Sequence, residues 1–377
     1  MAKLFFSFSL PILLLSICLN LQSQNNPRDL QINWKTNTNK RIIELNELTT
    51  LLQPDQIPPI YEPEYQVIEN ALRLLSPYEP LISLEIDGDA KGYPLSILMF
   101  HEIVNDRVGG QAVSVTYCPL CNAAIVFDRK ITHNNEELIL DFGVSGMLRK
   151  SDLVMWDHQT ESWWQQLTGQ AIVGELTSHQ LKVVPSLVIS VEQFSATYPN
   201  GKILKHPEVE NPRYGSNPYV NYDDLDNKNP FLFNEETDSR LAPMGRVVDV
   251  SIDGQKKLYP YSVLRQKKVI HDKFMGEEFV VFFHEKTLSV LGDATIAENH
   301  MVGSAGVFQP QLKGETLSFS YKDGKIYDDQ TNSIWNIAGY CMEGHYAGSS
   351  LRVVPHANHF AFAVLAFYPE SIIYPMD

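Results

Sequence analysis

The pattern of apolar and polar positions along the chain predicts many short strands and a few short helices. Leu81 to Ile86 is largely apolar and ends in Asp87-Gly88, a pair typical of hairpin turns. Pro94 suits a first helical turn, and a helix is expected from Pro94 to Val104. Ala112 to Tyr117 then alternates as a half-buried strand does. The expected fold class is α+β and β-rich, because the regular strand–helix alternation of a doubly wound parallel sheet is missing.

Further segments complete the predicted elements. Strands are expected at Ala123 to Phe127 and at Leu138 to Phe142, where apolar residues cluster. A short helix is expected from Val191 to Tyr198, since Pro199 cannot continue it. Glu64 to Leu75 has apolar residues at helical spacing, so a helix is expected there as well.

The same order of signals occurs twice in the chain. Ile86-Asp87-Gly88 returns as Ile252-Asp253-Gly254, an offset of 166 positions (252 minus 86). Later pairs in the same order are Tyr93-Pro94 with Tyr259-Pro260, Trp164 with Trp335, and Val183-Val184-Pro185 with Val353-Val354-Pro355. Ordered matches over such a length indicate a duplicated domain, and the period is too long for a solenoid. The sequence therefore predicts two tandem copies packed as a pseudo-symmetric pair.

These signals divide the chain into five parts. A signal peptide is expected at residues 1–23 and an N-terminal extension at 24–79. The first repeat takes residues 80–205 and the second, degenerate repeat takes 246–377. Between them, residues 206–245 form a connector rich in Asn, Pro, Asp and Tyr, which we expect to pack on the repeats because long structureless linkers are uncommon in compact domains.

The N-terminus favours export. Lys3 precedes an apolar run from Leu4 to Leu15, which is too short and badly flanked for a membrane span. Cleavage after Ser23 would leave a periplasmic or extracellular protein. Attachment of a lipid at Cys18 is the alternative, although the bulky Ile17 makes a poor lipid-attachment site. No later segment has the roughly 18 consecutive apolar residues of a membrane helix, so no transmembrane segment is expected.

Charge and cysteine content restrict the partners. The 377 residues carry a net charge of -15, which argues against nucleic acid as a partner. The remaining partners are an unidentified small molecule or protein. Removal of the signal peptide leaves Cys118, Cys121 and Cys341. An exported chain of this length with so few cysteines does not depend on disulfides for its fold.

The candidate chemistry lies between His101 and Cys121. Cys118-Pro-Leu-Cys121 forms a turn of the kind that binds a metal, and His101 is predicted to lie on the buried face of the preceding helix. Thiolates and imidazole suit zinc and copper. A fourth position is left to Met155, His158, Asp128 or an exogenous ligand.

Two other interpretations of the cysteine pair remain open. Cys118 and Cys121 could form a structural disulfide in an oxidising compartment, which would make the protein a non-catalytic binding or scaffold protein. They could also act as a thiol–disulfide oxidoreductase. A redox pair normally opens a helix, whereas this pair lies between two predicted strands. The sequence names no reaction, so whether the chain is an enzyme stays undecided.

The second repeat serves as an internal comparison. At the offset of 166, Cys118 corresponds to His284, Cys121 to Thr287 and His101 to Lys267, so the candidate site exists only in the first repeat. An acidic site of Asp152, Asp157 and Glu161 is a weaker candidate. Asp157 corresponds to Asp328 or Asp329 in the second repeat, which favours a structural role for it.

Several blocks of the sequence resemble a known family. These blocks are Phe100 to Asp106, Tyr117 to Cys121, Phe142 to Gly146, Ser151 to Met155 and Asp157 to Trp163. They are similar to exported bacterial and archaeal proteins grouped as domain of unknown function 3179, from about residue 55 to the C-terminus. Asn122 replaces the usual Gly and Phe100 the usual Trp; Asn also accepts a positive φ. The resemblance implies the fold and export, and it implies no activity.

Overall fold

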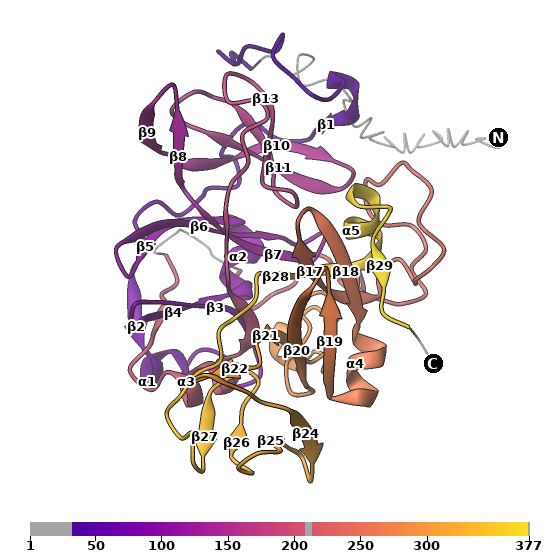
Figure 1. The fold of residues 1–377 in the computed structure, drawn as a ribbon. Coiled ribbons are helices and arrows are strands. Elements are labelled where there is room, and N and C mark those ends of the chain that lie inside the picture. Colours follow the sequence, from indigo (N-terminus) through magenta and orange to yellow (C-terminus); the bar gives the residue numbers. More distant parts are fainter. Residues whose placement is uncertain (1–31, 208–212, 376–377) are drawn as a thin grey trace, which may run out of the picture.

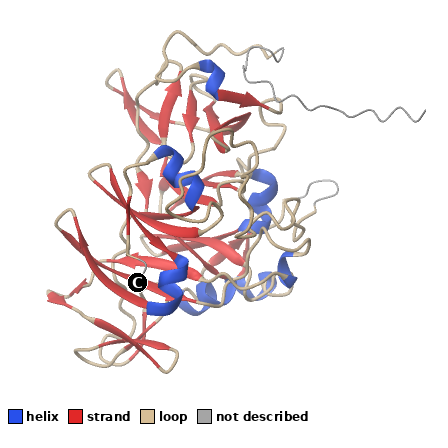
Figure 2. Cartoon of the chain, turned by 90° about the vertical axis from the view of Figure 1, so that its right-hand side faces the viewer, coloured by secondary structure: helices blue, strands red, loops and turns tan. Residues whose placement is uncertain are grey.

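The computed structural model describes residues 32–207 and 213–375 (Figure 1). The predicted signal peptide, its cleavage site and Cys18 lie outside these residues. Strands far outnumber helices, and the helices are short, as Figure 2 shows. The expected β-rich α+β class is thus confirmed. Within the described residues, no helix is both long enough and apolar enough to cross a membrane.

The central sheet contains strands from distant parts of the chain. We call residues 80–205 the first half and residues 246–375 the second half. Strand β7 of the first half meets β28 of the second half where Ala124 pairs with Asn358. In spatial order the sheet contains β29 (Ile372–Ile373), β18 (Gln255–Pro260), β17 (Arg246–Ile252), β28 (His356–Phe360), β7 (Ala123–Asp128), β6 (Gln111–Cys118) and β5 (Ile103–Val108), with β14 (Val183–Val184) also paired to β7. The turn between β6 and β7 therefore lies close to the junction of the two halves.

Two smaller sheets flank the central one. The first contains β15 (Leu187–Ser190), β3 (Pro80–Ile86), β4 (Asp89–Pro94), β16 (Lys202–Leu204) and β2 (Tyr65–Val67). The second contains β19 (Val269–Phe274), β20 (Glu277–His284) and β21 (Ser304–Phe308). Strand β15 of the first sheet contacts β21 of the second, so the two halves touch at a second place.

Two further sheets lie at opposite ends of the molecule in Figure 1. The upper one contains β1 (Leu48–Thr50), β10 (Phe142–Arg149), β11 (Asp152–Asp157), β12 (Trp163–Gln165) and β13 (Gln170–Val173). The lower one contains β24 (Phe319–Lys322), β25 (Lys325–Asp328), β26 (Ile334–Trp335) and β27 (Cys341–Glu343). The remaining hairpins are β8 (Lys130–His133) with β9 (Glu136–Ile139), and β22 (Gln311–Leu312) with β23 (Glu315–Thr316).

The helices fill the space beside these sheets. They are α1 (Ile68–Ala71), α2 (Leu95–His101), α3 (Val191–Thr197), α4 (Tyr261–Lys267) and α5 (Ala361–Phe367), together with the 3-10 turns η1 (Leu45–Glu47) and η2 (Ile296–Glu298). Helix α2 is almost wholly buried and contacts β6. It ends at His101, so the predicted helix as far as Val104 is three residues too long. Glu102 adopts φ 57°, which stops the helix, and β5 begins at Ile103.

Strands β3, β4, β15 and β16 pair as β17, β18, β28 and β29 do. The order β15–β3–β4–β16 matches β28–β17–β18–β29, and the last strand is parallel to its neighbour in both sets. Local contacts also match. Asp157 accepts hydrogen bonds from Trp164 Nε1 (2.8 Å) and the Thr160 amide, and Asp328 accepts them from Trp335 Nε1 (2.9 Å) and the Thr331 amide. Asp157 therefore fastens a turn to a buried tryptophan, in agreement with the structural role expected for it.

Two predicted elements differ from the structure. Tyr65–Val67 is a strand and only Ile68–Ala71 is helical, because Tyr65–Val67 pairs with β16 and this pairing overrides the local helical spacing. The single strand expected at Leu138 to Phe142 is divided: β9 ends at Ile139 and β10 begins at Phe142. The predicted strands at β3, β6 and β7 and the helix α3 agree with the structure to within a residue or so.

Candidate metal centre

The two cysteines lie on the tight turn between the central strands β6 and β7. Cys118 ends β6, and the amide of Asn122 donates a hydrogen bond to the carbonyl of Pro119 (3.1 Å). Asn122 adopts φ 48°, a conformation that Asn accepts at lower cost than most residues. The prediction that Asn122 can replace glycine here is confirmed. Both cysteine side chains are buried, with 2% exposure for Cys118 and 0% for Cys121.

Asp152 reaches the same place from the β10–β11 hairpin. Lys150 and Ser151 have φ angles of 52° and 69°, the paired positive values of a tight hairpin turn, and Asp152 begins β11. Its Oδ2 accepts hydrogen bonds from Gln165 Nε2 (2.7 Å) and the amide of Leu167 (2.9 Å). Its Oδ1 is buried and makes no hydrogen bond of ordinary geometry with the described residues. Oδ2 is therefore fixed in position by these two donors, and the carboxyl group's further polar neighbours are the thiols of Cys118 and Cys121.

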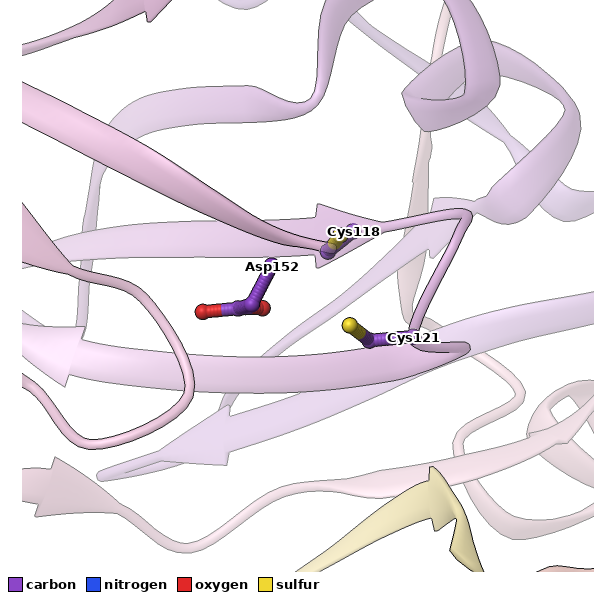
Figure 3. Close-up of side chains that lie close together, drawn as sticks. All are labelled: Cys118, Cys121 and Asp152. Atoms are coloured by element: carbon purple, nitrogen blue, oxygen red, sulfur yellow. The ribbon is translucent and has the colours of Figure 1, made fainter. Parts of the chain in front are cut away.

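The three side chains converge on one space (Figure 3). The sulfurs of Cys118 and Cys121 and a carboxylate oxygen of Asp152 all lie within 4.8 Å of one another. In Figure 3 the Cys121 sulfur points toward the space between the other two side chains. No disulfide joins the two cysteines. Two thiols and a buried carboxylate oxygen form a set of donors that suits a cation.

Burial determines the protonation of these groups when no ion is present. It raises the pKa of the Cys118 thiol, and it raises the pKa of the Cys121 thiol further, with Cys118 adding to the effect. Burial also raises the pKa of Asp152 to about 6. The nearby Glu102 carboxyl is buried as well, and burial together with the charge of Asp152 raises its pKa to about 8. The cluster therefore holds acidic groups in a place that disfavours their charged forms unless a cation compensates.

His101 does not join this group. Its Nδ1 lies 2.7 Å from the carbonyl oxygen of Pro58 and its Nε2 lies 2.6 Å from the hydroxyl of Tyr214. The carbonyl can only accept, so Nδ1 carries the proton and Nε2 accepts from Tyr214. Burial lowers the pKa of His101, which favours this neutral form. The residue points inward, as the helical spacing indicated, but toward an N-terminal segment and the connector. The place beside the cysteines that was expected for His101 is taken by Asp152.

Two of the residues considered for a fourth ligand, His158 and Asp128, make contacts elsewhere. His158 Nε2 is 2.8 Å from the hydroxyl of Tyr61, and Asp128 accepts a hydrogen bond from Gln111 Nε2 (2.9 Å). Neither residue belongs to the group of three around Cys118. Met155 is buried in the same apolar cluster as the two cysteines, and its sulfur stays a candidate.

Asp152 was named in the sequence only with Asp157 and Glu161, and these three acidic residues do not form one site. Asp157 binds Trp164, and Glu161 accepts a hydrogen bond from the amide of Lys35 (2.6 Å). The closeness of Asp152 to Cys121 depends on how the β10–β11 hairpin packs against the turn between β6 and β7, which belongs to another sheet. No spacing in the sequence signals it.

The corresponding place in the second half holds a hydrogen-bonded polar group. His284 Nδ1 lies 2.6 Å from Gln193 Nε2, and Thr287 Oγ1 lies 2.6 Å from Ser304 Oγ. His284 and Thr287 of the second half are thus hydrogen-bonded to neutral partners, His284 to Gln193 of the first half, and no carboxylate lies in these contacts. The cluster of possible metal ligands, Cys118, Cys121 and Asp152, is therefore a property of the first half.

The connector and the second half hold the cysteine turn in place. The hydroxyl of Tyr222 donates a hydrogen bond to the carbonyl of Leu120 (3.0 Å), and the amide of Phe360 donates one to the carbonyl of Cys121 (2.9 Å). Both contacts use backbone carbonyls of the turn and do not involve the sulfurs, of which that of Cys118 lies 3.8 Å from the carbonyl oxygen of Ser151. The turn is thus fixed from outside, while its two thiols face Asp152.

Comparison with known proteins gives a family and no activity. The model of the family described as "Protein of unknown function (DUF3179)" matches residues 54–371. No curated protein and no solved structure matches the chain. The matched region contains every residue of the candidate metal centre. The chain therefore belongs to the DUF3179 family of proteins of unknown function.

Proposed function

We propose that this protein binds one zinc or copper ion through Cys118, Cys121 and Asp152. The observation that carries the proposal is the buried group of two sulfurs and a carboxylate oxygen within 4.8 Å of one another, in which Asp152 Oδ1 has no other partner. Thiols are weak hydrogen-bond donors, so a buried carboxylate with only thiols beside Oδ1 is poorly satisfied, and a bound cation would compensate its charge better. Thiolate donors select zinc and copper over magnesium or calcium.

The surrounding residues support this set of donors. Gln165 and the amide of Leu167 hold Oδ2 of Asp152, which orients Oδ1 toward the sulfurs in the way that outer hydrogen bonds orient metal ligands. The raised pKa values of the thiols mean that binding releases protons, so the affinity for the ion rises with pH. When bound, the ion would supply Lewis acidity or a store of metal. The burial of all three donors favours retention of the ion over rapid exchange.

We further propose that the two halves are copies of one domain packed as a pseudo-symmetric pair. The matching strand order β15–β3–β4–β16 and β28–β17–β18–β29 supports this, as do the matching contacts of Asp157 and Asp328. In this view the second half keeps the fold without counterparts of Cys118 and Cys121. It stabilises the cysteine turn of the first half through the hydrogen bond from the Phe360 amide to the Cys121 carbonyl. Export, which the N-terminal apolar run favours, would place the site in the periplasm or outside the cell.

A second candidate function is thiol chemistry at the same pair. The closeness of Cys118 and Cys121 favours it, since the pair could close as a structural disulfide or exchange electrons as a dithiol. Burial raises the pKa of both thiols, and a reactive thiol needs the opposite shift. A structural disulfide would also leave Asp152 Oδ1 without a partner. Metal binding explains all three residues together.

Cobalt substitution tests the proposal. The mature protein, freed of metal and reduced, is titrated with Co²⁺, and the near-ultraviolet absorption of thiolate–cobalt bonds is recorded. Cys118→Ser and Cys121→Ser should each remove most of this absorption. Cys341→Ser is the matched control, because Cys341 is buried in the second half with its sulfur near the carbonyl of Glu343 (3.3 Å), and it should change nothing. A spectrum that survives in the Cys118→Ser and Cys121→Ser double variant would refute metal binding at this place.

A further inference from the structure

A large cavity lies away from the cysteines, between the connector, helix α4 and the segment from His300 to Val302. Its volume is about 990 Å³, in the range of sites that enclose small molecules. Much of its wall is apolar and includes Leu241, Met244, Val247 and Met301. The cavity therefore offers a surface for the apolar body of a ligand.

The same cavity has a surplus of positive charge. Four cationic side chains line it, and they outnumber the two acidic ones, Asp223 and Asp238, by two. The four are Lys228, Arg240, Arg246 and Arg265. The whole chain has a net charge of -15, so this local surplus runs against the general charge of the protein. Anions are thus favoured here over cations.

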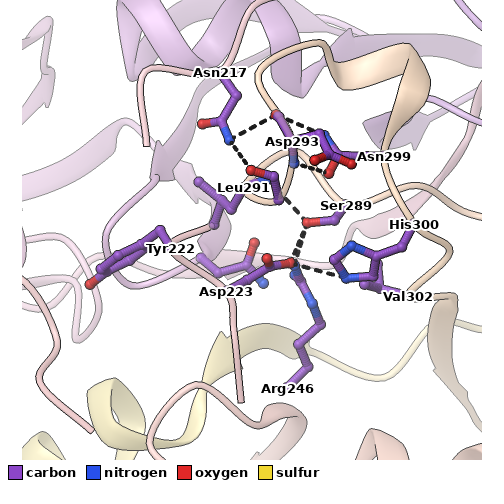
Figure 4. Close-up of polar contacts among 12 residues, drawn as sticks. Asn217, Tyr222, Asp223, Arg246, Ser289, Leu291, Asp293, Asn299, His300 and Val302 are labelled. Carbon is purple, nitrogen blue, oxygen red and sulfur yellow. Dashed lines mark hydrogen bonds and ion pairs between the residues drawn. The ribbon is translucent and has the colours of Figure 1, made fainter. Parts of the chain in front are cut away.

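Arg246 is fixed at one side of the cavity and keeps donors in reserve. Figure 4 shows its side chain reaching the group formed by Asp223, Ser289 and His300. Its Nη2 lies 2.8 Å from Asp223 Oδ2 and 2.8 Å from Ser289 Oγ, and its guanidinium lies over the ring of Phe360 at 5.2 Å. Because both polar contacts use Nη2, Nη1 and Nε can donate to a ligand. The guanidinium is held in one orientation before any ligand arrives.

The other cations differ in how far their charge is neutralised. Arg240 forms an ion pair with Asp238 (2.7 Å) and binds the carbonyls of Pro369 and Ser371, so it serves the fold. Arg265 donates to the carbonyl of Val302 (3.0 Å) and Lys228 lies 3.5 Å from the carbonyl of Leu225. Among the described residues, neither of these two forms an ion pair with a carboxylate. Arg265 and Lys228 therefore contribute charge that a ligand can use.

We propose that this cavity binds a small organic anion with an apolar body, of the class of medium-chain carboxylates. The head group would accept hydrogen bonds from Arg246 and Arg265, since guanidinium groups match the geometry of carboxylates. The hydrocarbon chain of the ligand would pack against Leu241, Met244 and Met301. Each methylene group that is removed from water in this way makes binding more favourable. This inference does not rest on the metal centre, which lies in the turn between β6 and β7.

Calorimetric titration of the mature chain with sodium octanoate tests the proposal. Two compounds serve as controls: acetate has the carboxylate without a long hydrocarbon chain, and 1-octanol has the hydrocarbon chain without the charge. Octanoate should bind at least tenfold more tightly than either, and added salt should weaken its binding. Equal binding of octanol and octanoate would overturn the anionic class, and a lack of octanoate binding would overturn the site. Protein treated with a chelator should give the same result, which separates this test from that of the metal centre.

Variants place the ligand within the cavity. Arg265→Gln should weaken octanoate binding by about tenfold or more, since hydrogen bonds to charged groups carry that much. Met301→Glu, which puts a carboxylate into the wall at a residue 39% exposed, should remove binding and leave thermal unfolding unchanged. Arg352→Gln is the matched control, because Arg352 lies outside the cavity and binds Gln309 Oε1 (2.8 Å). If Arg265→Gln and Met301→Glu both bind octanoate as the parent does, the cavity is not the site.

Discussion

Among single residues, Asp152 is the one on which the candidate metal centre depends most. Asp152→Asn should lower the affinity for the ion by tenfold or more, because loss of even an outer partner of a metal ligand has effects of that size. A competition titration with a chromogenic chelator measures this. Asp157→Asn is the control on the same strand. It should destabilise the fold by about 1–3 kcal/mol through the loss of its bonds to Trp164 and Thr160, with metal binding unchanged.

The ionisation of Asp152 also gives the metal-free protein a dependence on pH. Burial raises its pKa from 3.8 to about 6, so between these values the folded state keeps a proton that the unfolded state has lost. Raising the pH through this range therefore favours unfolding. The free energy of unfolding should fall by about 3 kcal/mol for this residue from about pH 4 to about pH 7. Denaturant unfolding in the presence of chelator measures it. Asp152→Asn should have a weaker pH dependence, and identical curves for the two proteins would contradict the account.

At the residue scale the sequence predicts the two cysteines of the site and not their partner. Cys118 and Cys121 are close in the chain, so a local pattern is sufficient to find them. Asp152 comes to them only because the β10–β11 hairpin packs against the turn between β6 and β7 of another sheet, and no local pattern specifies that packing. The helical spacing correctly predicts that His101 is buried, with 4% exposure, but burial alone does not say which groups it meets.

Among the elements, the turn from Pro119 to Asn122 determines where the sulfurs lie. Asn122→Val should destabilise the protein by about 1–2 kcal/mol, because a β-branched residue resists the positive φ that this position requires. Asn122→Gly should cost much less, although it loses the contact between the Tyr117 hydroxyl and Asn122 Oδ1 (3.2 Å). The midpoints of chemical unfolding measure the difference. Equal midpoints for the two variants would show that the backbone conformation of the turn is not limiting.

The elements that local patterns predict well are those whose neighbours agree with the pattern. β3 and β7 are largely apolar and β6 alternates, and each pairs with an adjacent strand of the chain. Tyr65–Val67 fails because its partner, β16, lies far along the chain and imposes a strand on a helical spacing. Local sequence therefore predicts hairpins better than long-range pairings.

At the scale of the whole molecule, the connector and the second half close over the cysteine turn. Tyr222→Phe should destabilise the protein by about 1 kcal/mol, because the carbonyl of Leu120 loses its donor and the amide of Phe231 loses its acceptor (3.2 Å). It should also speed the reaction of Cys118 and Cys121 with a thiol reagent. Tyr327→Phe, in the distant strand β25, is the control and should leave that rate unchanged. An unchanged rate in Tyr222→Phe would mean that the connector does not protect the turn.

The central claim is that Cys118, Cys121 and Asp152 hold one ion. The most direct test is the metal content of the mature protein, purified from its own compartment without chelator, with the reactive thiols counted on the same sample. The account predicts one zinc or copper ion per chain, with Cys118 and Cys121 unreactive until a chelator removes it, and no bound ion in Cys118→Ser. A protein without zinc or copper, or a Cys118→Ser variant that keeps its full metal content, would contradict the account.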